Sequence, residues 1–299
     1  MNELDARVVT ELEAGPVVTN PPVSRSLQLV VHRVDAKKEY RNMKLVIIGG
    51  TGLIGSKVVS RLRERGHEVV AASPGTGVNT LTGEGLSSAL QGASVVVDVS
   101  NSPSFEDAAV MTFFTTSTRH LIESAKAAGV EHYVALSVVG TERMTDSPYL
   151  RAKNAQEALI RDSGVPFSIV HATQFFEFFK RIADEATDGT TVRLPSALIQ
   201  PMAADDVADA VAMTALGAPV NGTVEVAGPQ QFRFDDLIRQ GLAARHDPRE
   251  VVVDPRARYF GARLGERSLV PGADARLGGI HFQDWLKQSE LVAASPTSR

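Results

Sequence analysis

The chain contains no cysteine among its 299 residues. Disulfide bonds, thiolate metal sites and cysteine nucleophiles are therefore excluded, and a reducing compartment such as the cytoplasm fits this composition. No apolar run approaches the roughly 18–20 residues of a membrane-spanning helix. The seven histidines form neither the H-E-x-x-H nor the H-x-x-E-H pattern of zinc sites, so we expect no metal centre.

A strong excess of charge of either sign is also missing. The formal net charge is -4, which gives no general reason to expect a nucleic-acid partner. Charged residues make up 22% and hydrophobic residues 43% of the chain, as in ordinary globular proteins. We therefore expect a cytoplasmic protein without a nucleic-acid or membrane partner, while the oligomeric state stays open.

The first 42 residues differ in composition from the rest. They contain Pro16, Pro21 and Pro22, charges of both signs and one short apolar patch at 27–31. This composition favours a disordered N-terminal extension over 1–42. The alternative is an interaction arm, or an added edge strand formed by 27–31.

The most informative segment begins at Lys44. Apolar residues at 45–48 are followed by glycines at 49, 52 and 55, then by an amphipathic pattern over 53–64. A glycine turn between a buried strand and a helix is typical of a dinucleotide-binding unit. One glycine makes the turn, one lets a pyrophosphate approach the backbone, and one lets the helix pack on the strand. The alternative is a tight turn without a ligand.

Strands and helices alternate from residue 43 onward. Strands are predicted at 44–48, 68–73, 94–100, 133–137, 167–171 and 223–226, with a weak or absent strand near 78–81 and helices at 53–64, 106–128 and 149–163. This alternation predicts an α/β fold with a Rossmann-type doubly wound parallel sheet, which the strand at 223–226 closes. We expect one NAD(P)-binding domain over 43–288. Its small C-terminal substrate lobe is built mainly from 174–222 and 229–288, and a flexible tail covers 289–299.

A second pattern lies at the start of the helix expected at 149–163. Tyr149 and Lys153 are four residues apart and share one helix face. An ammonium beside a phenol favours the phenolate, which lowers the pKa of tyrosine and suits it to acid–base catalysis. Ser137 ends the preceding strand and is placed to share a substrate carbonyl with Tyr149, so we predict that all three residues are catalytic. The alternative for the Tyr149–Lys153 pair is a solvated helix face.

Together these patterns resemble the short-chain dehydrogenase/reductase superfamily. The finer pattern is similar to its atypical NmrA-like, NAD(P)H-binding branch at 49–55, 165–170, 174–176, 200–208 and 226–229, and the resemblance covers about 43–288. It implies that Tyr149 is the proton donor, that Lys153 binds ribose and activates the tyrosine, and that Ser137 is the carbonyl partner. The chain departs from the superfamily at 100–103, where Asn101 is kept but the usual glycine is not.

The end of the second strand bears on the choice of cofactor. An acidic residue there would accept the ribose hydroxyls of NAD and repel the 2′-phosphate of NADP. Residues 71–76 contain no carboxylate, Ser73 and Thr76 offer hydroxyl groups, and Lys57 is near in sequence. We therefore expect NADP(H) to be preferred over NAD(H). The alternative for the two hydroxyls is local bonding within the turn.

The predicted cofactor contacts are Gly49, Thr51, Gly52, Leu53, Ile54, Gly55, Ser73, Asn101 and Lys153. The predicted substrate pocket contains Gln174, Phe175 and Phe176, because aromatic residues after the strand at 167–171 suit a quinone or a flat carbonyl compound. The favoured function is an NAD(P)H-dependent oxidoreductase that reduces a small carbonyl or quinone substrate. Two alternatives stay open: a non-catalytic NmrA-like NAD(P) redox sensor and an extended-branch sugar-nucleotide epimerase.

Overall fold

The computed structural model describes the backbone of residues 42–294 and the side chains of 42–289. The expectations for the N-terminal extension, including an edge strand at 27–31, therefore lie outside the described residues. Among residues 42–294, no helix combines the length and the apolar character that crossing a bilayer requires.

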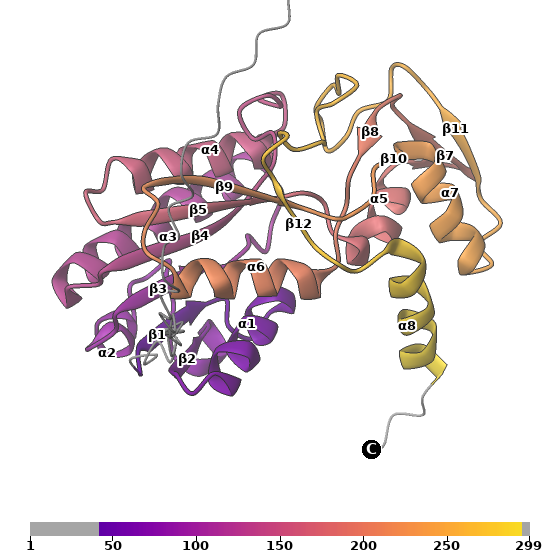
Figure 1. Cartoon of the computed structure of the whole chain (residues 1–299). Coiled ribbons are helices and arrows are strands. Elements are labelled where there is room, and N and C mark those ends of the chain that lie inside the picture. Colours follow the sequence, from indigo (N-terminus) through magenta and orange to yellow (C-terminus); the bar gives the residue numbers. More distant parts are fainter. Residues whose placement is uncertain (1–41, 295–299) are drawn as a thin grey trace, which may run out of the picture. The chain divides into compact units, whose positions relative to one another are not determined.

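A seven-stranded sheet forms the centre of the described residues (Figure 1). In spatial order the strands are β12 (Arg276–Leu277), β9 (Gly222–Ala227), β5 (Phe167–Ala172), β4 (His132–Val138), β3 (Val95–Asp98), β1 (Lys44–Ile48) and β2 (Glu68–Ala72). All neighbouring strands pair in parallel. β2 and β3 lie on opposite sides of β1, so the strand order reverses there. In such sheets ligands bind beyond the carboxyl ends of the strands at this reversal.

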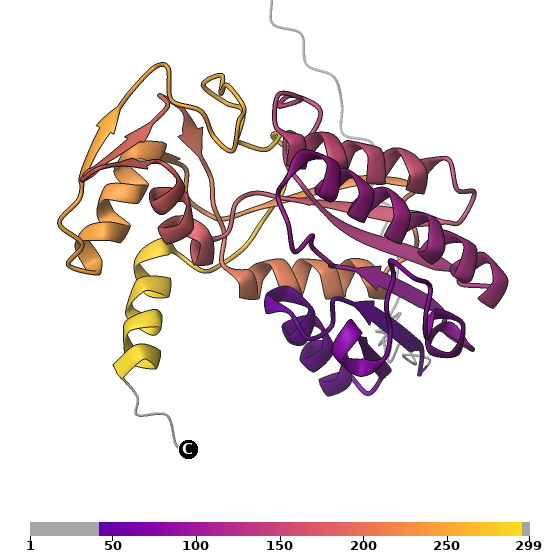
Figure 2. The ribbon, with the colours of Figure 1, turned by 180° about the vertical axis from the view of Figure 1, so that it is seen from behind.

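Helices cover both faces of the sheet. Figure 2 shows α3 (Asp107–Ala128) and α4 (Pro148–Arg161) on one side, and α1 (Leu53–Glu64) and α6 (Ala204–Leu216) on the other. Alternation along β1 explains this arrangement, because Leu45 and Ile47 pack with α1 and α6 whereas Val46 and Ile48 pack with α2 (Leu86–Leu90) and α3. The Rossmann-type doubly wound sheet is therefore confirmed.

Two details of the sheet bear on the predicted strands, and the second differs from expectation. Residues 78–81 form no strand and make only an isolated bridge between Asn79 and Glu84, so the third strand, predicted as weak or absent, is absent from the described residues. β9 does not close the sheet, because β12 pairs along its outer edge. β12 is only two residues long, so it is too short to produce an apolar pattern from which a strand could be predicted.

A smaller lobe is built from the C-terminal half of the chain (Figure 1). Its helices are α5 (Phe179–Glu185), α7 (Phe234–Ala244) and α8 (Phe282–Ala294). Its strands are β6 (Thr187–Asp188), β7 (Thr191–Leu194), β8 (Leu198–Ile199), β10 (Phe232–Arg233) and β11 (Glu250–Val253). They form two small sheets around an aromatic core of Phe176, Phe179, Phe234, Phe282 and Trp285.

The extent of the lobe differs from the predicted ranges in two places. α6 lies within 174–222 but packs on the central sheet, because its buried Val207 and Val211 join the apolar cluster of β1 and α1. α8 continues to Ala294, so residues 289–294 of the predicted tail are helical.

Candidate active site

A cavity of about 710 Å³ lies where the carboxyl ends of the central strands meet the lobe. Its volume is within the range of small-molecule sites, roughly 300–1,000 Å³. Lys153 and Arg181 line it, whereas no acidic side chain of the described residues does. The cavity is therefore suited electrostatically to an anionic ligand.

The glycine turn between β1 and α1 forms one wall of this cavity. The backbone N–H groups of Gly49 and Gly50 donate hydrogen bonds to the Ala72 carbonyl oxygen at 2.9 and 3.1 Å, which ties the turn to β2. Gly49 has a φ of +78°, a conformation that side-chain-bearing residues rarely adopt. A Cβ atom on Gly55 would lie 2.1 Å from the Gly49 carbonyl oxygen, so only glycine lets the helix pack this closely.

The members of the turn divide into two groups. Residues that line the cavity are Gly49, Thr51, Gly52, Leu53 and Ile54. Gly55 does not line it, which corrects its prediction as a cofactor contact. Gly55 instead lies where α1 packs against the turn, because its Cα faces the Gly49 carbonyl oxygen.

The first turn of α1 is also arranged for an anion. Its N-cap residue Gly52 offers no side-chain cap, and no acidic residue stands in the turn. By contrast, α3, α6, α7 and α8 all carry aspartate in their first turns. The free N–H groups and positive dipole end of such a helix favour a phosphate group. The turn therefore fits the pyrophosphate of a dinucleotide.

The end of β2 offers neither a repelling carboxylate nor an attracting cation. Ser73 lines the cavity, but the Thr76 hydroxyl is used locally, because it accepts from the Ser73 N–H at 2.8 Å and donates to the Ala71 carbonyl oxygen at 3.1 Å. Lys57 pairs with Asp205 of α6, with Nζ 2.9 Å from the carboxylate oxygen. Lys57 is therefore engaged elsewhere, contrary to its suggested place near a 2′-phosphate.

Tyr149 lies in the first turn of α4 and lines the cavity. Its ring packs against Phe105 and Phe114, with ring centroids 5.6 and 5.8 Å apart. Burial raises the pKa of Tyr149 to about 12, although the charge of Arg181 acts in the opposite direction. The expectation that Lys153 lowers this pKa is wrong, because the aromatic surroundings disfavour the phenolate. The hydroxyl is therefore protonated at neutral pH.

Lys153 is held firmly at the edge of the cavity. Its Nζ donates hydrogen bonds to the Leu136 carbonyl oxygen at 2.8 Å and to Gln156, and it lies 4.5 Å from the centroid of the Phe114 ring. The Gln156 amide in turn donates to the Asp98 carboxylate at 3.0 Å. Burial lowers the pKa of Lys153 to about 8. Gln156 and Asp98 were missed by the sequence analysis, although Gln156 follows Lys153 by three residues on the same helix face.

Ser137 also lines the cavity, but its hydroxyl is engaged by a buried carboxylate. It donates a hydrogen bond to Glu157 at 2.5 Å, and the same carboxylate lies 2.8 Å from His171 Nε2 and 2.7 Å from Arg161. Burial alone would raise the pKa of Glu157, but bonds and charge from His171, with further hydrogen bonds from Ser137 and Arg161, lower it to about 2. The structure therefore does not support Ser137 as a hydrogen-bond donor to a substrate carbonyl.

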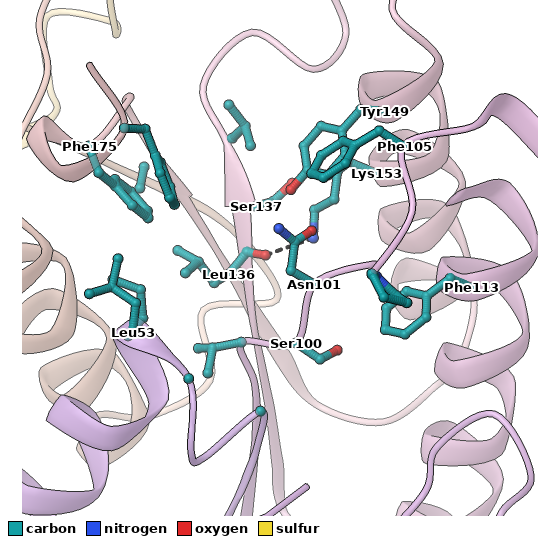
Figure 3. Close-up of a pocket in the computed structure, with 18 of the residues that line it drawn as sticks. Leu53, Ser100, Asn101, Phe105, Phe113, Leu136, Ser137, Tyr149, Lys153 and Phe175 are labelled. Carbon is teal, nitrogen blue, oxygen red and sulfur yellow. Dashed lines mark hydrogen bonds between the residues drawn. The ribbon is translucent and has the colours of Figure 1, made fainter. Parts of the chain in front are cut away.

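Figure 3 shows how the predicted residues gather around the cavity. Asn101, Ser137, Tyr149 and Lys153 lie together, opposite Phe175. Three predicted catalytic residues therefore share one space with predicted cofactor contacts from the strand ends. The sequence analysis also missed Glu157. Its only signal in the sequence is its position four residues after Lys153, on the same helix face.

The aromatic residues after β5 alternate between cavity and core. Gln174, Phe175 and Phe178 line the cavity, and the rings of Phe175 and Phe178 stack with centroids 5.5 Å apart. Phe176 is buried in the lobe against Trp285, so its prediction as a pocket residue is wrong. The 3₁₀ turn at Phe176–Phe178 causes this, because it directs successive side chains to different sides.

Comparison with known proteins agrees with this geometry. Residues 76–217 match a protein family described as NAD(P)H-binding. The photosystem II assembly factor Ycf39 of Cyanophora paradoxa is 28% identical over 149 residues, which cover 45% of this chain and 46% of that protein. The chain thus spans about half the length of the curated relatives it matches first.

Solved structures share the fold at low sequence identity. The UDP-glucose 4-epimerase of Thermus thermophilus, in complex with NAD, has a TM-score of 0.64 at 17% identity, covering 85% of this chain and 100% of that one. The triphenylmethane reductase of Citrobacter sp., complexed with NADP(H), has a TM-score of 0.51 at 19% identity, covering 72% and 79%.

Proposed function

We propose that this chain belongs to the NAD(P)H-binding, NmrA-like branch of the short-chain dehydrogenase/reductase superfamily and reduces a small carbonyl or quinone compound with NAD(P)H. One observation carries the proposal. The cavity joins a glycine turn suited to pyrophosphate with the protonated hydroxyl of Tyr149 in a space that no carboxylate of residues 42–289 lines.

The residues of the cavity have distinct roles in this reaction. When bound at the glycine turn, NAD(P)H would supply the hydride that the carbonyl carbon accepts. Tyr149 donates its hydroxyl proton to the carbonyl oxygen, so one hydride and one proton complete the reduction. Lys153 binds the ribose hydroxyls and stabilises the tyrosinate that remains after the proton leaves.

The proposed cofactor preference is NADP(H) over NAD(H). Its support is the absence of a carboxylate from residues 71–76, which removes the repulsion that a 2′-phosphate would meet. Competition between NADPH and NADH at fixed salt measures the preference. Tighter binding of NADH by tenfold or more would contradict it.

A second candidate is a redox sensor that binds NAD(P) without turnover. The hydrogen bond from Ser137 to Glu157 favours it, because one expected partner of the substrate carbonyl is engaged elsewhere. The Ycf39 relatives are named photosystem II assembly factors, a name that does not state a reaction. The epimerase alternative rests on fold likeness alone, and we do not propose it.

One experiment separates the two candidates. NADPH oxidation is measured against a panel of quinones and aldehydes, with nucleotide affinity determined by calorimetry in parallel. Turnover of any compound in the panel supports the reductase. Tight NADPH binding without turnover of any of them contradicts the reductase and favours the sensor.

A further inference from the structure

Arg181 of α5 carries positive charge to the substrate side of the cavity. Its guanidinium carbon lies 4.4 Å from the centroid of the Phe105 ring, and this ring packs against Tyr149. The charge of Arg181 is close enough to Tyr149 to oppose the rise that burial causes in its pKa. Arg181 therefore stands beside the group that we propose as the proton donor.

Arg181 differs from Lys180 and Arg249 because no carboxylate of residues 42–289 forms an ion pair with it. Acidic side chains are present on the same stretch of chain, but other groups engage them. Glu177 accepts hydrogen bonds at the start of α6, and Asp184 pairs with Lys180 at 2.7 Å and with Arg249 at 2.9 Å. Since the described part of the chain places no carboxylate along this cavity, such a guanidinium can bind an anion there.

Two aromatic pairs form the walls of the substrate side. Phe175 and Phe178 stack at an interplanar angle of 24°, and Phe105 lies at 33° to Tyr149. Figure 3 shows Phe175 on the opposite side of the cavity from Phe105 and Tyr149. Facing aromatic walls suit a flat ring, because such a ring can stack on either wall.

We propose that Arg181 determines specificity by binding an anionic group, a carboxylate or a sulfonate, on a planar aromatic or quinonoid substrate. The inference rests on the proposed reductase function and names its substrate class. The planar guanidinium binds the anion through paired hydrogen bonds, while the ring lies between the aromatic walls and its carbonyl faces Tyr149.

The test uses two probes, naphthoquinone sulfonate and uncharged naphthoquinone. Binding to the full chain is measured by calorimetry with NADP⁺ present, and reduction is measured with NADPH. We expect the wild type to bind the sulfonate at least about tenfold more tightly, a difference that added salt should reduce. Arg181→Met should abolish the difference while keeping an unbranched apolar stem against Phe105.

Lys180→Met is the matched control. It removes the adjacent cation of α5, which pairs with Asp184, and it should keep the preference for the sulfonate. Thermal unfolding checks that both variants fold. Equal binding of the two probes by the wild type would overturn the proposal. So would an Arg181→Met variant that loses affinity for both probes equally, or one that loses affinity for NADPH.

The two proposals can fail separately. A sulfonate preference that depends on Arg181, without reduction of either probe, supports the anion site and contradicts the reductase. Reduction of both probes without any preference supports the reductase and contradicts the anion site.

Discussion

The cofactor side and the substrate side of the cavity are built in different ways. The cofactor side consists largely of backbone and small residues at 49–54 and of strand ends such as Ser73 and Asn101. The substrate side consists of large side chains such as Phe105, Tyr149 and Phe178, which come from separate elements. Glycine sterics therefore shape one side, whereas packing between distant segments shapes the other.

Because they are built differently, the two sides should tolerate amino-acid substitutions to different degrees. The glycine turn is held by hydrogen bonds to Ala72, and an added Cβ at Gly49 would lie 3.0 Å from backbone atoms of Ser100. On the substrate side, the residues Phe105 and Phe178 are 37% and 40% exposed, so solvent on one side leaves them room to adjust. We expect sharp losses from small changes in the turn. On the substrate side we expect changes limited to turnover or selectivity.

The largest expected effect is on turnover, from Tyr149→Phe on the substrate side. The change removes only the hydroxyl, and turnover should fall by a factor on the order of 10²–10⁴, the usual contribution of a positioned acid. Nucleotide affinity and thermal unfolding should be nearly unchanged. Steady-state rates with a substrate found in the panel measure the effect. Full activity of Tyr149→Phe would mean that the proton comes from another group.

The next effect in size is on stability, from Gly55→Ala on the cofactor side. The new Cβ would lie 2.1 Å from the Gly49 carbonyl oxygen, so helix and turn must separate. We expect a loss of about 3 kcal/mol in the free energy of unfolding, the upper part of the usual range for overpacking. Denaturant unfolding measures it. Gly279→Ala is the control, because a Cβ there meets no atom within 4 Å, and equal stability of the two variants would contradict the prediction.

Gly52→Val should weaken nucleotide binding without a comparable loss of stability. A Cβ on Gly52 has one close neighbour, the Gly49 carbonyl oxygen at 3.3 Å, so it requires a much smaller shift than the 2.1 Å contact at Gly55. The branched methyl groups would occupy the space into which we place the pyrophosphate. We expect NADPH affinity to fall at least tenfold, about 1.4 kcal/mol. Unchanged NADPH affinity in calorimetry would contradict the assignment of this turn as the pyrophosphate site.

The smallest expected effect is a pH dependence of NADPH affinity that arises from Lys153. This residue lies where the two sides meet. Its pKa of about 8 means that the ammonium is charged below that pH and neutral above it. NADPH affinity should therefore fall severalfold as the pH rises through about 8, and Lys153→Met should lack this step. A wild-type profile identical to that of Lys153→Met would argue against a cofactor contact.

The lowered pKa of Lys153 also affects stability, and the free energy of unfolding should change with pH in the direction opposite to NADPH affinity. Burial depresses the pKa of Lys153 from 10.5 to about 8 in the folded protein, so between these values the unfolded chain binds more protons. The free energy of unfolding should therefore gain a contribution from this residue as the pH rises through that interval. Comparing wild type with Lys153→Met by denaturant unfolding isolates the contribution.

Local pattern in the sequence was enough to predict the sheet and the glycine turn. The strand at 44–48 and the helix at 53–64 have the predicted bounds, because apolar periodicity and glycine placement act over a few residues. The same holds for Tyr149 and Lys153, which α4 brings to the cavity on one face. Gly49 and Gly52 line the cavity for the same local reason.

Only the tertiary structure decided which partner each polar or aromatic side chain meets. Glu157 engages Ser137, and Asp205 engages Lys57 from a helix that lies far along the chain. The turn after β5 sends Phe176 into the lobe core, and α5 brings Arg181 beside Tyr149. These outcomes depend on which distant segments pack together and on which buried charge each donor must satisfy, and neither is encoded in local periodicity.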